Sequence, residues 1–558
     1  MAVSVAFVKA SCQGGALAKR RLSEGTEMKT TQGSRGRGLG LWSGCALLLS
    51  TLGTFLVLQG CSRNGPNGAD VAPPPVAPTA TPHLPERIQR FCGSCHENPP
   101  ADTFPRFAWK DLIERMYLMF NESGRPLQPP PIEEVVDYFE QRAPLQLPPA
   151  VFSRADHPLP VRLQRLDYPV CEGPPHVPSP HISHVNLVHL FSPQQLDVLA
   201  CEMYGGAVLL LQPYLTQPKW HVLYGTGPDK GFNPAHTEMV DLDQDGIPDI
   251  LVANLGSFLP TDRRCGSVLW LRGRNDGQFE PITLFKDKGR IADVQAADFN
   301  GDGKLDLLVA AFGWNKIGEI YYLENRTKDW KKPEFTAHML DDRHGTIHVP
   351  IADLNGDGKP DFVALISQEN ETVVAFLNDG TGRFDKRTLF KAPHPGYGSS
   401  GIQLVDLNGD GKLDVLYSNG DVLDKPYLLK PYHGIQWLEN KGDWTFEFHR
   451  LTSMYGVHRA VAADLDGDGD LDIVAVCFLP AENFPDRTSQ KLDAVIVLEQ
   501  TAPGVFARHT VEVENCDHVS CALGDIFGSG KLDVVTGNFT TQPLKHAITI
   551  WKDLGTIK

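Results

Sequence analysis

The pattern of apolar and polar positions changes near residue 160, and from there onward it is typical of β-structure. Short apolar runs alternate with turns that are rich in glycine and aspartate. The most regular signal is an aspartate followed at once by an apolar run of strand length, and these runs begin at Asp197, Asp249, Asp306, Asp361, Asp414, Asp472 and Asp533. Successive starts lie 52 to 61 residues apart. The sequence therefore predicts seven self-similar units, each long enough for four strands and their loops.

Each predicted unit has two apolar faces, which it cannot bury alone. In the second unit, a third strand over 268–271 and a fourth over 279–284 follow the acidic turn and its strand. Sheets packed face to face around an axis cover one another, whereas an open stack leaves two apolar faces in water. We therefore predict a mainly β fold, a seven-bladed β-propeller over residues 160–558.

The two ends of this region predict how the ring closes. The last unit stops after its third strand, 548–551, with too little chain left for a fourth. A segment that resembles a strand, 161–166, precedes the first unit and has no partner there. We expect this segment to supply the outer strand of the last blade.

Before the propeller, apolar residues recur at helical spacing. They are Phe107, Leu112, Ile113, Met116 and Phe120, followed by Ile132, Val135, Val136 and Phe139. Prolines at 126 and 129–131 separate the two groups. The pattern predicts a small all-α domain over residues 84–148.

Five of the seven turns carry the pattern D-x-[DN]-x-D-G-x-x-D. Alternate side chains of such a loop point inward, and the glycine at its sixth position lets the backbone reverse, so the loop offers the all-oxygen ligand set that calcium prefers. An EF-hand begins in the same way, but it needs a glutamate at position twelve between helices, and neither is present. The predicted calcium ligands are Asp241, Asp243, Asp245, Asp249, Asp298, Asn300, Asp302, Asp306, Asp353, Asn355, Asp357, Asp361, Asp406, Asn408, Asp410, Asp414, Asp464, Asp466, Asp468 and Asp472.

These loops account for much of the chain's acidity. The 558 residues carry a formal net charge of −16, and aspartates occupy seventeen of the twenty ligand positions. About five calcium ions would cancel roughly ten of these charges. In the last unit Phe527 and Ser529 replace the central ligands, and in the first only Asp197 remains, so we expect no calcium in either.

These loops and strands resemble those of the FG-GAP/VCBS repeat family over about 380 residues. That family forms seven-bladed propellers like that of integrin α. The resemblance implies a propeller with structural calcium, and it leaves the function open.

A second motif lies in the helical region, where Cys92-Gly93-Ser94-Cys95-His96 has the C-x-x-C-H spacing of covalent c-type haem attachment. We expect one haem c, with His96 as an iron ligand. Chance occurrence and a CxxC zinc or redox pair are the alternatives, but a second CxxC and a βαβ pattern are both missing. The segment resembles a short monohaem class I cytochrome c domain.

The second axial ligand of such a haem is open. Met116 and Met119 lie one helical turn apart, and we favour Met116. Either methionine also suits the wall of a haem pocket without binding iron. An open iron is the third alternative.

A candidate axial site comes from residues placed a few positions before the turns. These are His184, His236, Asp293, His348, His458 and His518. If each lies on the innermost strand of its blade, they converge on the propeller axis, where imidazoles suit a transition metal or a polar ligand. Because their offsets differ and a shift of one residue turns a side chain to the other face, a simple water-filled channel is the alternative.

The N-terminal residues predict export. Arg35 and Arg37 precede an apolar run that ends at Cys61, which resembles a lipoprotein signal over residues 1–60 with Cys61 as the lipidated residue. A membrane-spanning anchor is the alternative. A Pro/Ala-rich linker follows over 61–83. We expect a lipid-anchored protein in the periplasm or on the cell surface.

Three hypotheses for function follow. The first is a haem c electron-transfer protein, with the propeller as a docking or ligand-binding platform. The second is a redox enzyme whose axial site passes electrons to the haem, and the third is a calcium-dependent binding or adhesion module. Nothing in the sequence decides whether the protein is an enzyme, and the redox partner or small-molecule ligand is open. No basic stripe is present, so we expect no nucleic-acid partner, and we expect a monomeric propeller.

Overall fold

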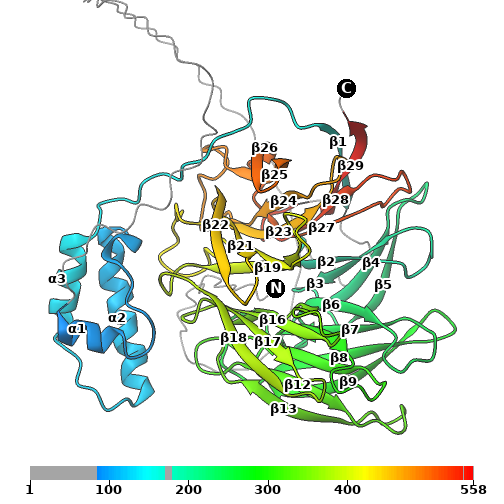
Figure 1. Ribbon diagram of the computed structural model, residues 1–558, viewed down its shortest axis with the longest axis horizontal. Helices are drawn as coiled ribbons and strands as arrows, with labels where there is room; N and C mark the ends of the chain where they lie inside the picture. The colour runs from blue at the N-terminus through cyan, green and yellow to red at the C-terminus, as the bar shows by residue number, and fades with distance from the viewer. Residues whose placement is uncertain (1–84, 170–178, 545, 557–558) are drawn as a thin grey trace, which may run out of the picture. The chain divides into compact units, whose positions relative to one another are not determined.

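The computed structural model describes residues 85–169, 179–544 and 546–556 (Figure 1). The predicted signal peptide, Cys61 and the Pro/Ala-rich linker lie outside these residues. Among the helices of the described ranges, none is both long enough and apolar enough to span a bilayer.

Seven separate antiparallel sheets make up the β-region, and each forms one blade. From the innermost strand outward, blade 1 contains β2 (Ile182–Val188), β3 (Asp197–Glu202), β4 (Ala207–Gln212) and β5 (Lys219–Gly225). Blade 2 contains β6 (Pro234–Val240), β7 (Asp249–Asn254), β8 (Gly266–Gly273) and β9 (Phe279–Lys288). Blade 3 contains β10 (Ile291–Ala297), β11 (Asp306–Ala311), β12 (Glu319–Asn325) and β13 (Phe335–Asp341).

The next three blades repeat this order. Blade 4 has a divided inner strand and contains β14 (Thr346–His348), β15 (Ile351–Ala352), β16 (Asp361–Ile366), β17 (Thr372–Asn378) and β18 (Phe384–Lys391). Blade 5 contains β19 (Ser399–Val405), β20 (Asp414–Asn419), β21 (Gly434–Asn440) and β22 (Phe446–Ser453). Blade 6 contains β23 (Val457–Ala463), β24 (Asp472–Cys477), β25 (Asp493–Ala502) and β26 (Val505–Val513).

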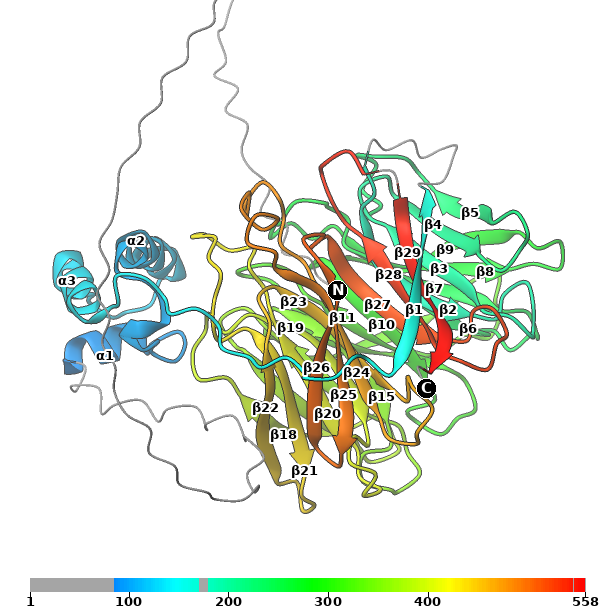
Figure 2. The same cartoon turned by 90° about the horizontal axis from the view of Figure 1, so that it is seen from above.

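Blade 7 is built from both ends of the β-region. Its inner strands are β27 (His518–Gly524) and β28 (Asp533–Asn538), followed by β29 (His546–Thr556) and finally β1 (Val161–Pro169). Strand β1 runs antiparallel to β29, with Leu166 opposite Ile550, and Figure 2 shows the two strands side by side. The predicted closure of the ring is confirmed.

Contacts between the inner strands complete the circle. They run from β2 to β6, β10, β14, β19, β23 and β27, and β27 contacts β2 again. All seven second strands begin at the predicted aspartates, and every residue in them is buried. Because apolar clusters bring together residues of neighbouring blades, each sheet is covered on both faces.

The helical region contains α1 (Glu86–Cys92), a 3-10 turn (Ala101–Thr103), α2 (Arg106–Ser123) and α3 (Ile132–Arg142). Its core centres on Trp109, whose ring stacks on that of Phe139 at 4.2 Å. Phe107 departs from the predicted apolar face, since 65% of it is exposed. At about 100° per residue it lies on the side of α2 opposite Trp109.

Candidate functional site

The C-x-x-C-H motif begins with the last residue of α1. Cys92 is half-buried, and burial raises the pKa of its thiol to about 11. Cys95 is exposed. His96 places Nδ1 2.8 Å from the carbonyl oxygen of Glu97. That contact suits an Nδ1–H tautomer and leaves Nε2 without a proton, which is the form of imidazole that binds a metal.

A pocket of about 450 Å³ adjoins this motif. On the helical side it is lined by Gln89 and by the run from Gly93 to Asn98, which includes Cys95 and His96. The donor set of two thiols and one imidazole therefore fits a covalently attached haem, whereas the lining of the adjoining space is mainly polar. None of the described residues that line the pocket is a methionine. Met116 is half-buried on α2 and Met119 is 44% exposed, and neither lines this pocket.

The acidic loops lie between the two inner strands of blades 2 to 6, and each is closed by its own aspartates. In blade 2 the last aspartate, Asp249, accepts hydrogen bonds from the backbone nitrogens of Leu242 at 3.0 Å and Gly273 at 2.6 Å. The first, Asp241, accepts from the nitrogens of Asp245 and Gly246. Blades 3 to 6 repeat the bonds to the last aspartate.

Charge accumulates inside these loops. In two of them, three carboxylate oxygens lie within 4.8 Å of one another, from Asp241, Asp243 and Asp249 and from Asp464, Asp466 and Asp468. Burial raises the pKa of Asp472 to about 7, and repulsion from Asp466 adds to this effect. A cation would relieve both costs, so the donor set fits calcium.

In blades 2, 4 and 5 a basic side chain is ion-paired with a loop carboxylate: Arg272 with Asp243, Lys359 with Asp357 and Lys412 with Asp410. Arg272, on β8, is ion-paired with Asp243, and its guanidinium lies 3.7 Å from Asp245. An ion bound between these carboxylates would have to displace the arginine. Calcium would therefore compete with Arg272 in blade 2, with Lys359 in blade 4 and with Lys412 in blade 5.

The structure brings four of the six predicted axial residues together. In blades 1 to 4 the pairing between the inner strand and the second strand shifts its register near the start of the inner strand. The first paired residue after this shift is His184, His236, Asp293 and His348, respectively. The rings of His184 and His236 are 4.4 Å apart. His236 Nδ1 lies 3.0 Å from one oxygen of Asp293, and His348 Nδ1 lies 3.8 Å from the other.

The electrostatics favour neutral rings at His184 and His348 beside the carboxylate of Asp293. Burial lowers the pKa of His348 to about 3 and that of His184 well below its usual value. Burial opposes ionisation of Asp293 as well, but the two neighbouring imidazoles hold its pKa well below the usual range. His184 Nδ1 and His348 Nε2 are buried and have no hydrogen-bond partner among the described residues. Neutral imidazoles with unused nitrogens can hold a metal or a polar ligand.

The two remaining axial candidates lie elsewhere. In blade 6 the equivalent position is occupied by Arg459, and His458, one residue earlier, places Nδ1 3.1 Å from the carbonyl oxygen of Val519. In blade 7 the equivalent position is Ser520, and His518, two residues earlier, pairs with Glu512 at 2.7 Å. The prediction that His518 faces the axis is wrong, because the strand irregularity follows it.

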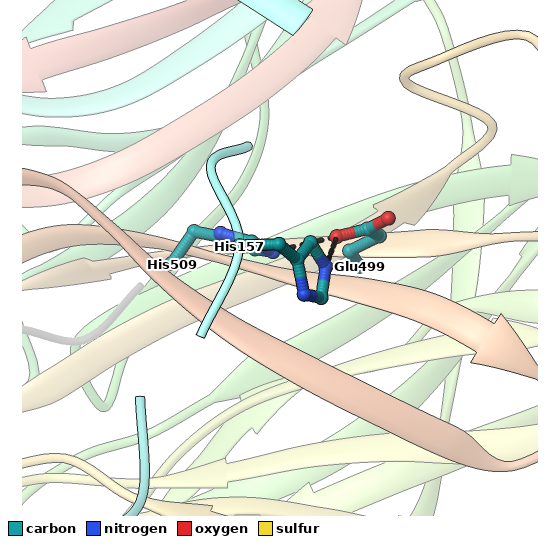
Figure 3. A group of neighbouring side chains, drawn as sticks. All are labelled: His157, Glu499 and His509. Carbon is teal, nitrogen blue, oxygen red and sulfur yellow. Dashed lines mark hydrogen bonds and ion pairs between the residues drawn. The ribbon is translucent and has the colours of Figure 1, made fainter. Parts of the chain in front are cut away.

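One cluster was missed by sequence reasoning. His157, Glu499 and His509 bring their side chains together on the outer part of blade 6 (Figure 3). Glu499 and His509 lie on β25 and β26, whereas His157 belongs to the segment before β1. His157 is more than 300 residues from the other two in the sequence, so no spacing could have indicated the cluster.

The seven sheets and their repeated acidic turns define a β-propeller. Parts of the chain match the family described as FG-GAP-like repeat, over residues 241–309, 353–417 and 421–475. The chain thus contains FG-GAP-like repeats within a seven-bladed propeller. Such a propeller suggests a binding or docking module.

Similar proteins have been described in other organisms. A T-cell immunomodulatory protein homolog of Plasmodium yoelii yoelii is 26% identical over 229 residues, which are 36% of this chain and 32% of that protein. Cartilage acidic protein 1 of Mus musculus is 22% identical over 270 residues, 45% of this chain and 39% of that protein. The match spans less than half the length of either relative.

One solved structure is described as a crystal structure of BBS1N in complex with ARL6DN, soaked with lead. It aligns with a TM-score of 0.40 at 10% identity, over 69% of this chain and 96% of that chain.

Proposed function

We propose that this protein is an exported electron-transfer protein that carries one haem c on its helical region and uses its propeller as a docking platform. Cys92 and Cys95 would hold the haem through thioether bonds, and Nε2 of His96 would bind its iron. When bound, the haem would supply one-electron chemistry. The observation that carries the proposal is the engagement of His96 Nδ1 by a backbone carbonyl beside the pocket.

The attachment is tested in cells that mature c-type cytochromes. We expect a haem that stays bound after denaturation and gives the absorption bands of reduced haem c. The Cys92→Ala/Cys95→Ala double variant should lose this covalent haem. Cys265→Ala, which alters a half-buried thiol of the propeller, should retain it. An unmodified parent protein would refute the proposal.

The second axial ligand is tested separately. We retain Met116 as the proposed ligand on the sequence argument, with Met119 as the matched alternative on the same helix. Carbon monoxide should leave the Soret band of the parent unchanged and shift it in Met116→Ala only. A shift in the parent would mean an open iron.

The calcium ions are part of the same proposal. About five ions would be bound by the acidic loops of blades 2 to 6, each fixing the turn between two inner strands. The clustered carboxylates and the raised pKa of Asp472 support this assignment.

Location is proposed on sequence grounds alone. Lipidation at Cys61 would anchor the chain in the periplasm or at the cell surface, where a monomeric propeller would meet a redox partner. Incorporation of labelled fatty acid into the parent, and its loss in Cys61→Ala, tests the anchor.

A second candidate function is favoured by the grouping of His184, His236, Asp293 and His348. In this case the axial group would bind a transition metal or substrate, and electrons would pass from it to the haem. Reduction of the haem by a substrate, lost in His236→Ala but not in His338→Ala on an outer strand, would support an enzyme. Anomalous scattering at the copper and iron edges would report a metal on the axis.

A further inference from the structure

The outer face of blade 6 carries a cluster of metal-binding side chains that the loops and the axis do not use. We propose that His157, Glu499 and His509 form a site for a zinc-like divalent transition metal. The site would fasten the segment that precedes β1 onto blade 6. It is independent of the haem.

The three ligand atoms already converge. His157 Nε2 lies 2.9 Å and His509 Nε2 lies 2.6 Å from the same oxygen of Glu499. In a tetrahedral zinc site with bonds of about 2.0–2.1 Å, neighbouring ligand atoms lie roughly 3.3 Å apart. A shift of less than an ångström in each side chain would therefore admit the ion. Two imidazoles and one carboxylate leave a fourth position for water.

A further carboxylate orients one of the ligands. Asp156 places an oxygen 3.2 Å from His157 Nδ1. This contact fixes the ring so that Nε2 faces Glu499, an arrangement that commonly supports metal-binding histidines. His509 is 6% exposed and His157 is 43% exposed, so the site is held from inside and open to solvent on one side.

The segment that carries His157 is itself attached to blade 6. The nitrogen of Ala155 donates to the carbonyl oxygen of Arg508 at 2.8 Å. Arg154 pairs with Asp493 at 3.1 Å, and the guanidinium of Arg508 lies over the ring of Phe152. His157 is therefore held beside β26 before any ion binds, which reduces the entropic cost of forming the site.

Other blades show why this cluster is more than a surface ion pair. Blades 3 and 5 carry the same histidine–glutamate pair at the equivalent positions, as His338 with Glu324 and His449 with Glu439. In each, a basic residue two positions after the glutamate neutralises it, Arg326 at 2.7 Å and Lys441 at 2.9 Å.

Blade 6 replaces that basic residue. The position after Glu499 that corresponds to Lys441 is Thr501, and no lysine or arginine of the described residues is paired with Glu499. A second imidazole, from His157, takes its place. The blade thus exchanges a fixed positive charge for a metal ligand.

The test is a zinc titration of the calcium-saturated full chain without a polyhistidine tag. His157→Gln and His509→Gln should each lose one equivalent of zinc, with affinity at that site reduced at least about 100-fold, and Asp156→Asn should weaken it about tenfold. His449→Gln, in the matched pair of blade 5, should bind as the parent does. Cobalt(II) in the parent should give the intense visible bands of a four-coordinate ion.

Two results would overturn the proposal. One is unchanged zinc stoichiometry in His157→Gln, and the other is an equal loss in His449→Gln. His157 belongs to no strand, so its variant should keep the parent's zinc-free melting temperature. Zinc should also slow hydrogen exchange over residues 150–158 in the parent and leave it unchanged in His157→Gln.

Discussion

Blades 6 and 7 are neighbours in the ring and share the same turn between their inner strands, but they are completed in different ways. Blade 6 is one continuous segment, and its loop keeps Asp464, Asp466, Asp468 and Asp472. Blade 7 takes its outer strand from the other end of the β-region. Its loop has Phe527 and Ser529 at the two central positions.

The turn itself is held alike in both blades. Asp472 accepts from the nitrogens of Leu465 and Gln500 at 3.1 and 2.9 Å. Asp533 accepts from those of Ile526 and Asp553 at 3.0 and 2.9 Å. The hydrogen bonds to the last aspartate therefore form in both blades, although blade 7 lacks the central carboxylates. In blade 6 the central carboxylates of Asp466 and Asp468 also accept from the backbone nitrogens of Asp468 and Asp470, each at 3.1 Å, and we propose that they bind a cation.

The largest expected effect comes from deleting the strand that completes blade 7. Deleting Val161–Pro169 removes β1 and exposes the whole edge of β29, so we expect the melting temperature to fall by more than about 10 °C. Removing Leu145–Pro149, which belong to no helix or strand, should change it by about 2 °C or less. Thermal unfolding followed by circular dichroism measures both. Equal effects would mean that β1 is dispensable.

The last aspartates should matter equally in the two blades. Asp472→Ala and Asp533→Ala each leave two buried N–H groups without acceptors, which we expect to cost about 3 kcal/mol of unfolding free energy. Urea unfolding in calcium-free buffer gives both values. A large loss in blade 6 alone would show that its turn is organised differently. The exposed Asp385 is the control.

Calcium binding should distinguish blade 6 from blade 7. We expect a chelator to lower the melting temperature of the parent, since a site at one hundred times its Kd contributes about 2.7 kcal/mol. Asp466→Ala should bind one calcium ion fewer than the parent, whereas Ser529→Ala should bind the same number. Calcium content after dialysis is the measurement. An unchanged count in Asp466→Ala would remove blade 6 from the set of calcium sites.

Acid should destabilise blade 6 through its buried inner histidine. Burial lowers the pKa of His458 to about 4, so its stabilising contribution is complete above about pH 6.5 and is lost as the pH falls. We expect a loss of about 1 kcal/mol at pH 5.5 from this residue. His458→Gln should flatten the pH dependence of unfolding below 6.5. His518→Gln, in blade 7, leaves His458 in place and should keep this acid sensitivity.

The smallest effect would come from converting the blade 7 loop. Phe527→Asp with Ser529→Asp restores the acidic pattern, and we expect one additional calcium ion. The stabilisation should stay below about 1 kcal/mol, because the ammonium of Lys552 lies 4.3 Å from the centre of the Phe527 ring and would oppose the ion. Calorimetric titration with calcium measures the gain. The Phe527→Leu/Ser529→Ala variant, which adds no ligand, should bind no more than the parent.

Much of the fold was predictable because its signals are local and repeated. The aspartate that begins each second strand also closes its turn, so one residue marks both the loop and the strand. The unpaired segment near 161–166 indicated the closure because strands in a sheet need partners.

The sites were less predictable, for two physical reasons. The direction in which His458 and His518 point depends on a register shift in the inner strand, which places Arg459 and Ser520 at the axial position instead. The sequence does not indicate where this shift occurs. The cluster of His157, Glu499 and His509 forms only where a linker crosses a blade. Sequence spacing carries no information about such a contact.

The pairing of β1 with β29 has a consequence for how the chain matures. Because β1 pairs with β29, the last strand of the region, the ring cannot close until the final blade has been translated. Until then both flanking sheets show apolar faces to chaperones and proteases. A prematurely terminated chain would remain in that open state, so only a chain that includes β29 can close the ring.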